Sequence, residues 1–370
     1  MPKSKVFFID LRTAIGGESH LTKLRKLVEK AGIGTIDFQN KFVAIKVHFG
    51  EDGNLSYLRH NYAKVLVDLI KEKGGRPFLT DCATLYPGCR KDALAHLDCA
   101  FLHGYNPMGT GCHVVIGDGL KGTDEALVPV AGKYVTSAKI GRAIMDADIV
   151  ISLNHFKGHE MTGFGGAIKN IGMGCGSRAG KMEMHCEGKP KVDPKACVGC
   201  KACAKQCGQD AIAFAKGKAV IDPATCVGCG RCIGACNFDA ISGTNWNRPK
   251  LLNYRMAEYA LAVLQGRPHF HVNLVIDVSP YCDCHGENDI PIVPNVGFFA
   301  SFDPVALDRA CVDACNAMPA VPGSVIDGKR YCAEEHFGEA LRPNTEWRSG
   351  LEHAETLGLG TMDYAKIVVK

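Results

Sequence analysis

Eight cysteines in one short stretch constrain this chain more than any other feature of its sequence. The stretch from Cys197 to Cys236 carries the pattern CxxCxxCxxxC twice, as CVGCKACAKQC and CVGCGRCIGAC. A 4Fe–4S cube needs four thiolates that converge on its corners, and three cysteines spaced by two residues can wrap one side of it. The fourth cysteine of each run then points away and ligates the other cube. We therefore predict two 4Fe–4S clusters bound by crossed sets of ligands.

The crossed pairing gives each cluster four cysteines. The first set is Cys197, Cys200, Cys203 and Cys236, and the second set is Cys226, Cys229, Cys232 and Cys207. Matched segments, GQDAIAF and NFDAISG, follow the two runs and indicate a duplicated unit. Two zinc sites are the alternative, but eight thiolates without a histidine at these spacings argue against them. The stretch resembles the dicluster bacterial ferredoxins, although Gly208 and Asn237 replace the proline that usually follows the fourth cysteine, which affects loop rigidity rather than ligation.

Length and charge narrow the function classes. A chain of 370 residues suggests more than one unit, and 46% hydrophobic residues suffice for a large core. The net charge of +4 is slight and no block of like charges occurs, so we expect no nucleic-acid partner. The sequence contains no run of eighteen apolar residues, so we expect no membrane span. The N-terminal stretch lacks the features of a signal peptide.

The number of cysteines bears on the cellular setting. Nineteen cysteines in a chain without a secretory signal are expected to be reduced thiols and metal ligands rather than disulfides. Since cubane clusters are damaged by oxygen, we expect the cytoplasm of an anaerobe.

Strands alternate with helices on both sides of the cysteine stretch, which predicts an α/β body with a mostly parallel sheet. Strands are expected at 4–10, 41–49, 76–80, 113–117, 148–153, 271–278 and 365–369. Helices are expected at 19–32, 57–73, 91–103, 141–146, 250–265, 303–317 and 346–358. The simplest organisation is a body formed by 1–187 and 246–370, with a small α+β ferredoxin-like domain inserted at 188–245.

Polar residues gather where the predicted strands end, which is where open α/β sheets build their sites. The densest gathering is 154–185. Its glycines at 163, 165, 166, 172, 174 and 176 would let the backbone approach a bound group closely. The candidate catalytic residues are His48, Glu51, His155, His159, Lys169 and Cys175. The histidines suit acid–base chemistry or metal ligation, and the lysines suit a small anionic ligand. The alternative is that each histidine caps or packs and that the lysines are solvated.

A second group of cysteines follows the strand at 271–278. Cys282 and Cys284 are two residues apart, which in an extended chain places both sulfurs on one face. This arrangement suits either an extra metal site or a redox-active dithiol. Cys311 and Cys315 share one face of a predicted helix; they could complete a third metal site, but packing as small hydrophobes is the simpler interpretation. A third metal centre or a small-molecule ligand is therefore left open.

Five longer strings resemble one family. They are KVHFGEDGN, TDCATLYPG, HFKGHEMTGFGGAIKNIGMGCGSRAGK, SPYCDCH and FFASFDPVALDRAC, and they are similar to the domain-of-unknown-function family 362, whose members often carry an inserted dicluster ferredoxin segment. The resemblance implies an α/β body, two 4Fe–4S clusters and a redox role, without supplying a reaction.

The leading hypothesis is an iron–sulfur electron-transfer protein that relays electrons between a soluble redox partner protein and a site on the body. One alternative is an oxidoreductase that reduces a small anionic substrate at the face rich in histidine and glycine. Another is a metal-handling or maturation factor that uses Cys282 and Cys284. Neither the electron donor and acceptor nor the oligomeric state follows from the sequence.

Overall fold

A central β-sheet organises the body of the protein. The computed structural model describes residues 3–86, 88–185, 189–243, 249–329 and 335–370. In this described part the main sheet has eight strands in the order β16-β1-β15-β14-β7-β2-β3-β4. Strand β15 is antiparallel to both neighbours, and the other five neighbouring pairs are parallel. The predicted α/β fold with a mostly parallel sheet is therefore confirmed.

The strands of the main sheet agree closely with the predicted ones, with one addition. Their bounds are β1 (Ser4–Asp10), β2 (Phe42–Lys46), β3 (Arg76–Asp81), β4 (Val114–Ile116), β7 (Ile149–His155), β14 (His269–Val275), β15 (Gly297–Ser301) and β16 (Tyr364–Val368). Strand β15 was not predicted, because a five-residue apolar run has no periodicity that identifies a strand. Every residue of β7 and β15 is buried, as expected for strands covered on both faces.

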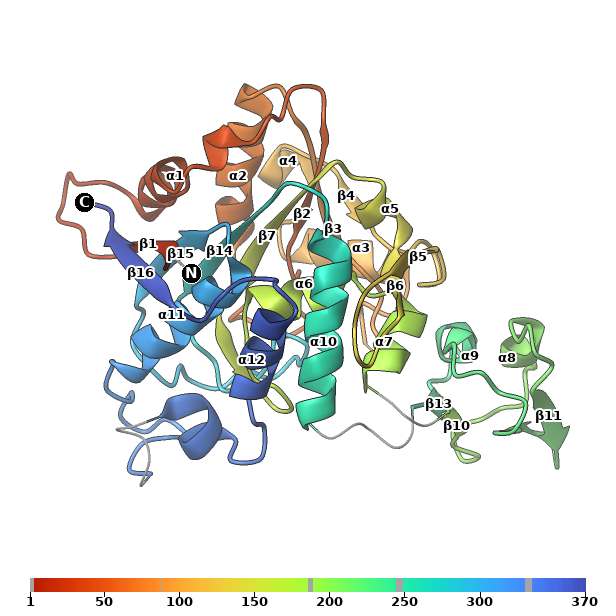
Figure 1. Ribbon diagram of the computed structural model, residues 1–370. Helices are drawn as coiled ribbons and strands as arrows, with labels where there is room; N and C mark the ends of the chain where they lie inside the picture. Colours follow the sequence, from red (N-terminus) through yellow and green to blue (C-terminus); the bar gives the residue numbers. More distant parts are fainter. Residues whose placement is uncertain (1–2, 87, 186–188, 244–248, 330–334) are drawn as a thin grey trace.

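Helices cover both faces of the sheet (Figure 1). One hydrophobic core packs against α1 (His20–Lys30) and α2 (His60–Glu72). The other packs against α6 (Ala167–Cys175), α10 (Pro249–Leu264) and α11 (Pro304–Asn316). The remaining helical segments of the body are η1 (Ile33–Thr35), α3 (Ala93–Leu102), α4 (Pro107–Thr110), α5 (Arg142–Met145), α7 (Arg178–His185), η2 (His336–Leu341) and α12 (Arg348–Thr356).

Two hairpins and one disulfide complete the body. The hairpins pair β5 (Glu125–Pro129) with β6 (Ser137–Gly141), and β8 (Lys157–His159) with β9 (Gly163–Gly165). Cys89 and Cys99 form a disulfide, with their Cα atoms 6.0 Å apart. This corrects the expectation that all cysteines would be reduced or bound to metal: the loop after β3 brings Cys89 against α3, within bonding reach of Cys99.

The cysteine-rich stretch forms a small unit at one side of the body (Figure 1). It contains two short antiparallel pairs of strands, β10 (Lys191–Val192) with β13 (Ile241–Ser242) and β11 (Ile212–Ala215) with β12 (Lys218–Ile221). Two short helices, α8 (Ala202–Lys205) and α9 (Arg231–Ala235), complete it. We call residues 189–243 the cysteine module. Both predicted limits of the inserted domain, at 188 and 245, lie outside the described residues.

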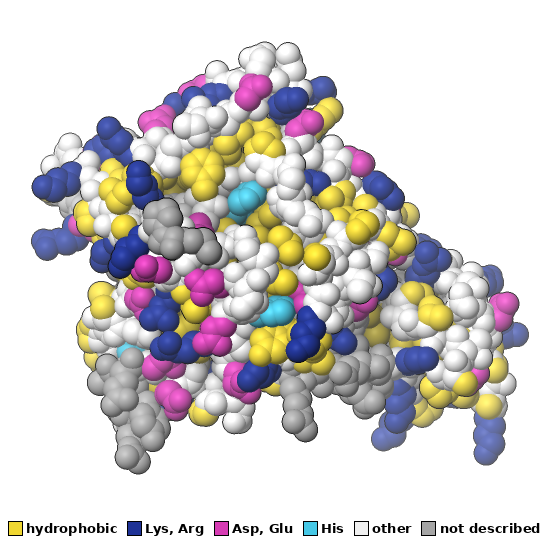
Figure 2. Space-filling model, viewed as in Figure 1, with side chains coloured by type: hydrophobic (Ala, Val, Ile, Leu, Met, Phe, Trp, Pro, Cys, Tyr) yellow, Lys and Arg dark blue, Asp and Glu magenta, His cyan; other side chains and the backbone are white. Residues whose placement is uncertain are grey.

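The surface in view mixes acidic and basic side chains, and basic side chains project from the lower edge of the cysteine module (Figure 2). Among the helices of the described residues, none has the length and apolar character that a bilayer crossing requires.

Candidate functional site

A cavity of about 610 Å³ lies at the carboxyl ends of four adjacent parallel strands, β14, β7, β2 and β3. In an open α/β sheet this edge is where ligands bind, because the loops that leave the strands converge there. The loops after all four strands contribute lining residues, and so do α6 and α7. The predicted gatherings of polar residues therefore meet around one cavity.

Five of the six candidate catalytic residues line this cavity: His48, Glu51, His155, His159 and Lys169. Cys175 is not among the lining residues. It lies at the end of α6 with no exposed surface, and burial raises the pKa of its thiol to about 11. Its sulfur is therefore a protonated thiol packed in the core.

Lys46 lines the cavity but was not predicted. Its ammonium group lies 2.9 Å from Oδ1 of Asp81 and donates to Oδ1 of Asn170 at 2.7 Å. Opposing charges keep this pair ionised although both side chains are almost fully buried: burial raises the pKa of Asp81, but the neighbouring cations, Lys46 first, lower it to about 2. The signal in the sequence was a lysine within an otherwise apolar strand.

Arg90 joins two carboxylates of the cavity wall. Its guanidinium contacts Glu51 at 3.2 Å and Asp81 at 3.4 Å and donates to the hydroxyl of Tyr86. Glu51 also accepts the backbone N–H of Cys89 at 2.6 Å. Glu51 therefore anchors Arg90 and the loop after β3, rather than facing the cavity as a free base.

Backbone N–H groups hold His48 and His159 in the same tautomer. The backbone N–H of Gly50 donates to Nδ1 of His48, and those of Met161 and Thr162 donate to Nδ1 of His159. A ring nitrogen that accepts carries no proton, so Nε2 carries the proton in each neutral ring. Burial lowers the pKa of both rings, to about 3 for His159. Both histidines are therefore neutral hydrogen-bond donors.

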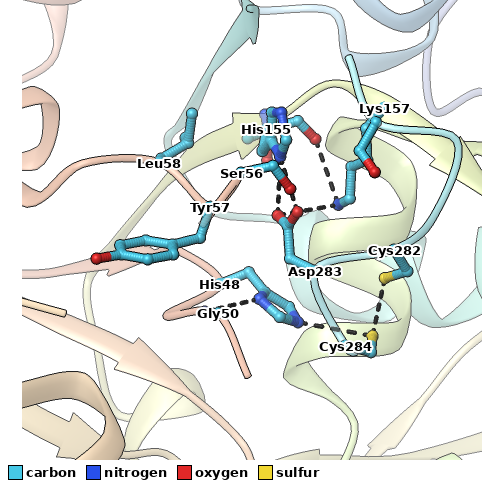
Figure 3. Close-up of polar contacts among 12 residues, drawn as sticks. His48, Gly50, Ser56, Tyr57, Leu58, His155, Lys157, Cys282, Asp283 and Cys284 are labelled. Atoms are coloured by element: carbon cyan, nitrogen blue, oxygen red, sulfur yellow. Dashed lines mark hydrogen bonds and ion pairs between the residues drawn. The ribbon is translucent and has the colours of Figure 1, made fainter. Parts of the chain in front are cut away.

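His155 holds the loop that follows β14. Its Nδ1 lies 2.9 Å from Oδ2 of Asp283, and its Nε2 lies 2.8 Å from the carbonyl oxygen of Ile276 (Figure 3). Burial raises the pKa of Asp283, but His155 and Lys157, whose ammonium group is 3.7 Å away, hold it below its usual range. Because Asp283 stands between Cys282 and Cys284, this contact fixes the turn that carries both sulfurs.

The two sulfurs of that turn lie 2.8 Å apart (Figure 3). Lys169 reaches the Sγ of Cys282 at 3.3 Å, and Nε2 of His48 lies 3.6 Å from the Sγ of Cys284. The hydrogen bond from Cys284 lowers the pKa of Cys282 to about 5, against the effect of burial and with the help of Lys169. The same hydrogen bond raises the pKa of Cys284. The pair is therefore one thiolate and one thiol that share a proton.

His48, Cys282 and Cys284 bring three donor atoms within 4.8 Å of one another, a set that could hold a metal ion. Two features fit a zinc-like ion poorly. A metal-bound histidine normally donates its other N–H outward, whereas Nδ1 of His48 accepts one. Thiolates bound to a tetrahedral zinc would lie about 3.8 Å apart, farther than these sulfurs. The arrangement fits a dithiol better than a metal site.

Helix α6, which supplies Lys169, was predicted as a glycine-rich loop. Asp308 caps its N-terminus by accepting the N–H groups of Ala167 and Ile168 at 2.7 and 3.0 Å. A Cβ on Gly166 would lie 2.2 Å from that carboxylate, and one on Gly172 would lie 2.1 Å from a carbonyl of α10. Gly166 and Gly172 thus allow close packing within the protein. Gly165, Gly166 and Gly174 also line the cavity, so their role toward a bound group stays a prediction.

The eight cysteines of the module form two groups of four. One small cavity is lined by Cys197, Cys200, Cys203 and Cys236, and another by Cys207, Cys226, Cys229 and Cys232. These are the two crossed sets. Residues 29 positions apart repeat the same left-handed backbone: Gly199 and Gly228 at φ 71° and 73°, and Asp210 and Asp239 at φ 49° and 50°. The two halves therefore share one local fold.

Helix α7 lies between the module and the body cavity. Its Lys181 and His185 line the cavity. Its Arg178 and Met182 meet the module instead: a Cβ on Gly234 would lie 2.4 Å from the Arg178 guanidinium, and one on Gly230 would lie 2.8 Å from Met182. One helix thus contacts both centres.

Cys311 and Cys315 lie in α11, apart from the other cysteines. Both are fully buried within the hydrophobic core, and burial raises the pKa of each thiol. Neither lines the body cavity. Packing is therefore their role.

Two solved structures share part of this architecture at low similarity. The lactate racemase apoprotein from Thermoanaerobacterium thermosaccharolyticum matches at 12% identity and a TM-score of 0.36, covering 74% of this chain and 51% of that one. A structural-genomics protein from Thermotoga maritima matches at 15% identity and a TM-score of 0.41, covering 80% of this chain and 57% of that one. The chain thus spans little more than half the length of either.

No curated protein matches the chain. The family model described as Domain of unknown function (DUF362) matches residues 43–313, which include the cavity, the cysteine module and the Cys282–Cys284 turn. The chain therefore belongs to the DUF362 family.

Proposed function

We propose that the chain is an iron–sulfur oxidoreductase in which two 4Fe–4S clusters in the module exchange electrons with a small anionic ligand in the body cavity. Bound clusters would supply one-electron transfer. The proposal assigns residues 188–245 to an inserted ferredoxin-like domain and residues 1–187 and 246–370 to the body. It also implies an anaerobic cytoplasm, since cubane clusters are damaged by oxygen.

The residues of the module fit two clusters. Each set of four cysteines lines its own cavity, and backbone N–H groups point at the sulfurs. Ala211 and Ala240 donate to Cys207 and Cys236, each at 3.3 Å, from matching positions in the two halves. Hydrogen bonds to cysteine sulfur stabilise the negative charge of a reduced cluster and so raise its potential.

Arg178 supports the position of the second cluster. Its side chain is fully buried, and within the described residues its Nε and Nη1 find no hydrogen-bond partner. An unpaired buried guanidinium is costly unless a negative group neutralises it. Asp118 and Asp92 act on Arg178 more strongly than Cys232 does, and a cluster held by Cys232 would add negative charge beside the two nitrogens that have no hydrogen-bond partner.

Electron transfer between the module and the cavity is supported above all by α7, which contacts both. Its Arg178 and Met182 meet the module beside Gly234 and Gly230, and its Lys181 lines the cavity on the other side. Leu85 also packs with the cysteines of the module while it lines the cavity. Electrons would therefore cross one layer of side chains between the Cys232 cluster and a ligand.

The outer end of the module suits a soluble redox partner. Cys200 is exposed, in contrast to Cys232, and Val198 beside it is exposed as well. The module carries six exposed basic residues, of which Lys201 lines the same small cavity as Cys200: Lys191, Lys195, Lys201, Lys205, Lys216 and Arg231. An acidic partner would meet complementary charge there, which would raise the rate of encounter.

The cavity favours an oxidoreductase over a pure carrier. A carrier needs no enclosed space, whereas this cavity of about 610 Å³ has the size of a small-molecule site. Lys157, Lys169 and Lys181 all face it, which supports an anionic ligand. The alternative of a metal-handling factor receives less support, since the hydrogen bonding of His48 suits a donor rather than a ligand.

Iron and sulfide analysis of anaerobically purified protein tests the clusters. We expect about eight irons per chain, the content of two cubes. Cys207→Ser with Cys226→Ser removes two ligands of one crossed set and should leave about four irons. The matched pair Cys197→Ser with Cys207→Ser touches both sets and should leave fewer. If each run instead bound its own cluster, the outcomes for the two double variants would be exchanged. Zinc in place of iron would contradict the proposal.

Cluster reoxidation tests the link to the cavity. Protein reduced with dithionite and desalted is mixed with nitrite, sulfite and a 2-oxo acid as small anionic probes, while the visible absorbance of the clusters is followed. At least one probe should reoxidise the clusters, and Lys181→Met should slow that reaction. Equal rates in wild type and variant for every probe would argue that the cavity takes no part.

A further inference from the structure

We propose that Cys282 and Cys284 are a redox-active dithiol that stores two electrons in the cavity wall and reduces a small anionic disulfide. The proposal deepens the function proposed above, on which it rests only for the source of the electrons. It is carried by the sulfur–sulfur contact, by the surroundings of the two sulfurs and by their unequal access to the cavity.

The surroundings of the sulfurs fit a thiol–thiolate pair. One side of the pair meets the ammonium group of Lys169, 3.3 Å from the Sγ of Cys282. The other side meets the protonated Nε2 of His48, 3.6 Å from the Sγ of Cys284. A cation and a neutral donor both stabilise a thiolate. The single negative charge of the pair is therefore held in place from both ends.

The turn that carries the pair is held by contacts with the neighbouring loops of the cavity wall. The backbone N–H of Cys282 donates to Glu160 at 3.1 Å, and the N–H of Glu51 donates to the carbonyl oxygen of Asp283 at 2.9 Å. Asp283 is in turn bound by His155. Formation of a bond between sulfurs already 2.8 Å apart would therefore need little movement of the backbone.

The two sulfurs differ in access. Cys284 lines the cavity, whereas Cys282 has no exposed surface and is not among the lining residues. Cys284 is thus placed to attack a ligand, and Cys282 to resolve the product. Because the sulfurs share one proton, the charge can move to Cys284 when the proton passes to Cys282.

The reaction balances as thiol–disulfide exchange. The Cys284 thiolate attacks one sulfur of the substrate disulfide and forms a mixed disulfide, and the first substrate thiolate leaves. Cys282 gives its proton to that thiolate and attacks the Cys284 sulfur, which releases the second thiolate and leaves a Cys282–Cys284 disulfide. Two electrons, one from each cluster, and one proton then restore the thiol–thiolate pair. Two single-electron centres therefore match one two-electron couple.

A redox titration tests the couple on the full-length wild-type protein. Samples are equilibrated anaerobically in mixtures of reduced and oxidised dithiothreitol, quenched in acid, denatured and alkylated, and the peptides are quantified by mass spectrometry. The peptide with Cys282 and Cys284 should pass from two alkylated cysteines to none across the series. Cys311 and Cys315, buried in α11, should stay fully alkylated and serve as the internal control. Two alkylated cysteines in every mixture would overturn the proposal.

Trapping with an anionic aromatic disulfide, 5,5′-dithiobis(2-nitrobenzoate), tests the order of attack. Cys282→Ser leaves the attacking thiol without its resolving partner, so the nitrothiobenzoate adduct should accumulate on Cys284. Cys284→Ser should leave Cys282 unmodified, because that sulfur does not reach the cavity. An adduct on Cys282 alone would overturn the assigned roles, and no adduct on either would overturn the substrate class.

The two proposals can fail separately. The dithiothreitol titration needs no cluster, and the iron analysis needs no dithiol. A chain without iron that still shows the two-thiol transition would contradict the proposed function and retain the couple. Eight irons without the two-thiol transition would support the two clusters and contradict the dithiol couple.

Discussion

The Nζ atom of Lys169 lies 3.3 Å from the Sγ of Cys282 beside the cavity, where Cys282 is fully buried and Lys169 is partly buried. A buried ammonium group and a buried thiolate each carry a large desolvation cost unless they are paired. Burial lowers the pKa of Lys169, but the charges of Cys282 and Cys284 outweigh it and hold that pKa above its usual value. Each partner thus keeps the other ionised.

Replacing Lys169 with Met should raise the pH at which the dithiol becomes reactive. The thiolate is the form that reacts with an alkylating agent, and the pKa of Cys282 is about 5 in the presence of Lys169. Transfer of the shared proton then places this charge on Cys284, the sulfur that lines the cavity. Wild-type alkylation by iodoacetamide should therefore be close to its plateau at pH 7 and fall as the pH drops below about 5. At pH 4, below both pKa values, we expect the variant to react roughly ten-fold more slowly, which corresponds to one unit of pKa.

The matched control is Lys181→Met, which removes another lysine of the same cavity. Its ammonium group donates to the carbonyl oxygen of Gly176 at 2.6 Å rather than to sulfur. Its pH profile should therefore follow the wild type. Identical profiles for all three proteins would mean that Lys169 does not set the reactivity of the pair.

Asp283→Asn should destabilise the protein by about 3 kcal/mol at neutral pH, since it breaks a buried contact with His155 and Lys157. Burial raises the pKa of Asp283, but His155 and Lys157 lower it further, so the folded state has the lower pKa. Its stabilisation is therefore fully present above the unfolded value of about 3.8 and is lost as the pH falls through the folded pKa. The difference between variant and wild type should shrink below pH 4.

Urea unfolding at several pH values measures this difference. Asp289→Asn is the control, because Asp289 is exposed in the same loop and should change stability by less than about 0.5 kcal/mol. A full difference that persists at pH 2 would contradict the ionic explanation.

The sequence predicted the sheet better than the roles of single side chains. Strand ends could be located from apolar runs, so the convergence of His48, His155 and Lys169 followed from the topology of a parallel sheet. Which atom of a histidine faces the cavity depends on backbone N–H groups such as that of Gly50, and no residue pattern reports these. For Cys282 and Cys284 the sequence left a metal site and a redox-active dithiol as alternatives. The contact that favours the dithiol, between Lys169 and Cys282, depends on α6 being a helix, and the sequence did not predict that helix.

That helix was missed because its stability comes from distant residues. The segment AIKNIGMGC has two glycines and no capping side chain of its own, so local propensity argues against it. Its cap is Asp308, which is 141 residues away in sequence from Ala167. Tertiary contacts of this kind override propensity and cannot be read from one sequence.

Asp308→Ala should therefore cost more than the loss of an ordinary cap. The carboxylate accepts two backbone N–H groups and one from the side chain of Asn273, and all of these donors would be left buried and unpaired. We expect a loss of about 3 kcal/mol, measured by urea unfolding. Ser19→Ala removes the exposed cap of α1 and should cost about 1 kcal/mol. Equal losses would mean that α6 does not depend on Asp308.

Arg178→Met should lower the reduction potential of the cluster assigned to Cys207, Cys226, Cys229 and Cys232. Reduction adds a negative charge to a cluster, and a buried cation beside it favours the reduced form. The guanidinium of Arg178 is fully buried at the contact between α7 and Gly234, so solvent screens it little. Its removal should shift the potential downward on the order of tens of millivolts.

Spectroscopic redox titration of both clusters measures the shift, and iron analysis shows whether the variant retains its clusters. Lys201→Met is the matched control, since Lys201 is an exposed cation that lines the cavity of the first cysteine set. Water and salt screen its charge, so its removal should move the potential of the first cluster much less. A shift of equal size in both variants would imply that the potential depends on the net charge of the protein and not on the position of the cation. No shift in Arg178→Met would mean that the unpaired guanidinium does not face a cluster, which would remove the electrostatic support for electron transfer across α7.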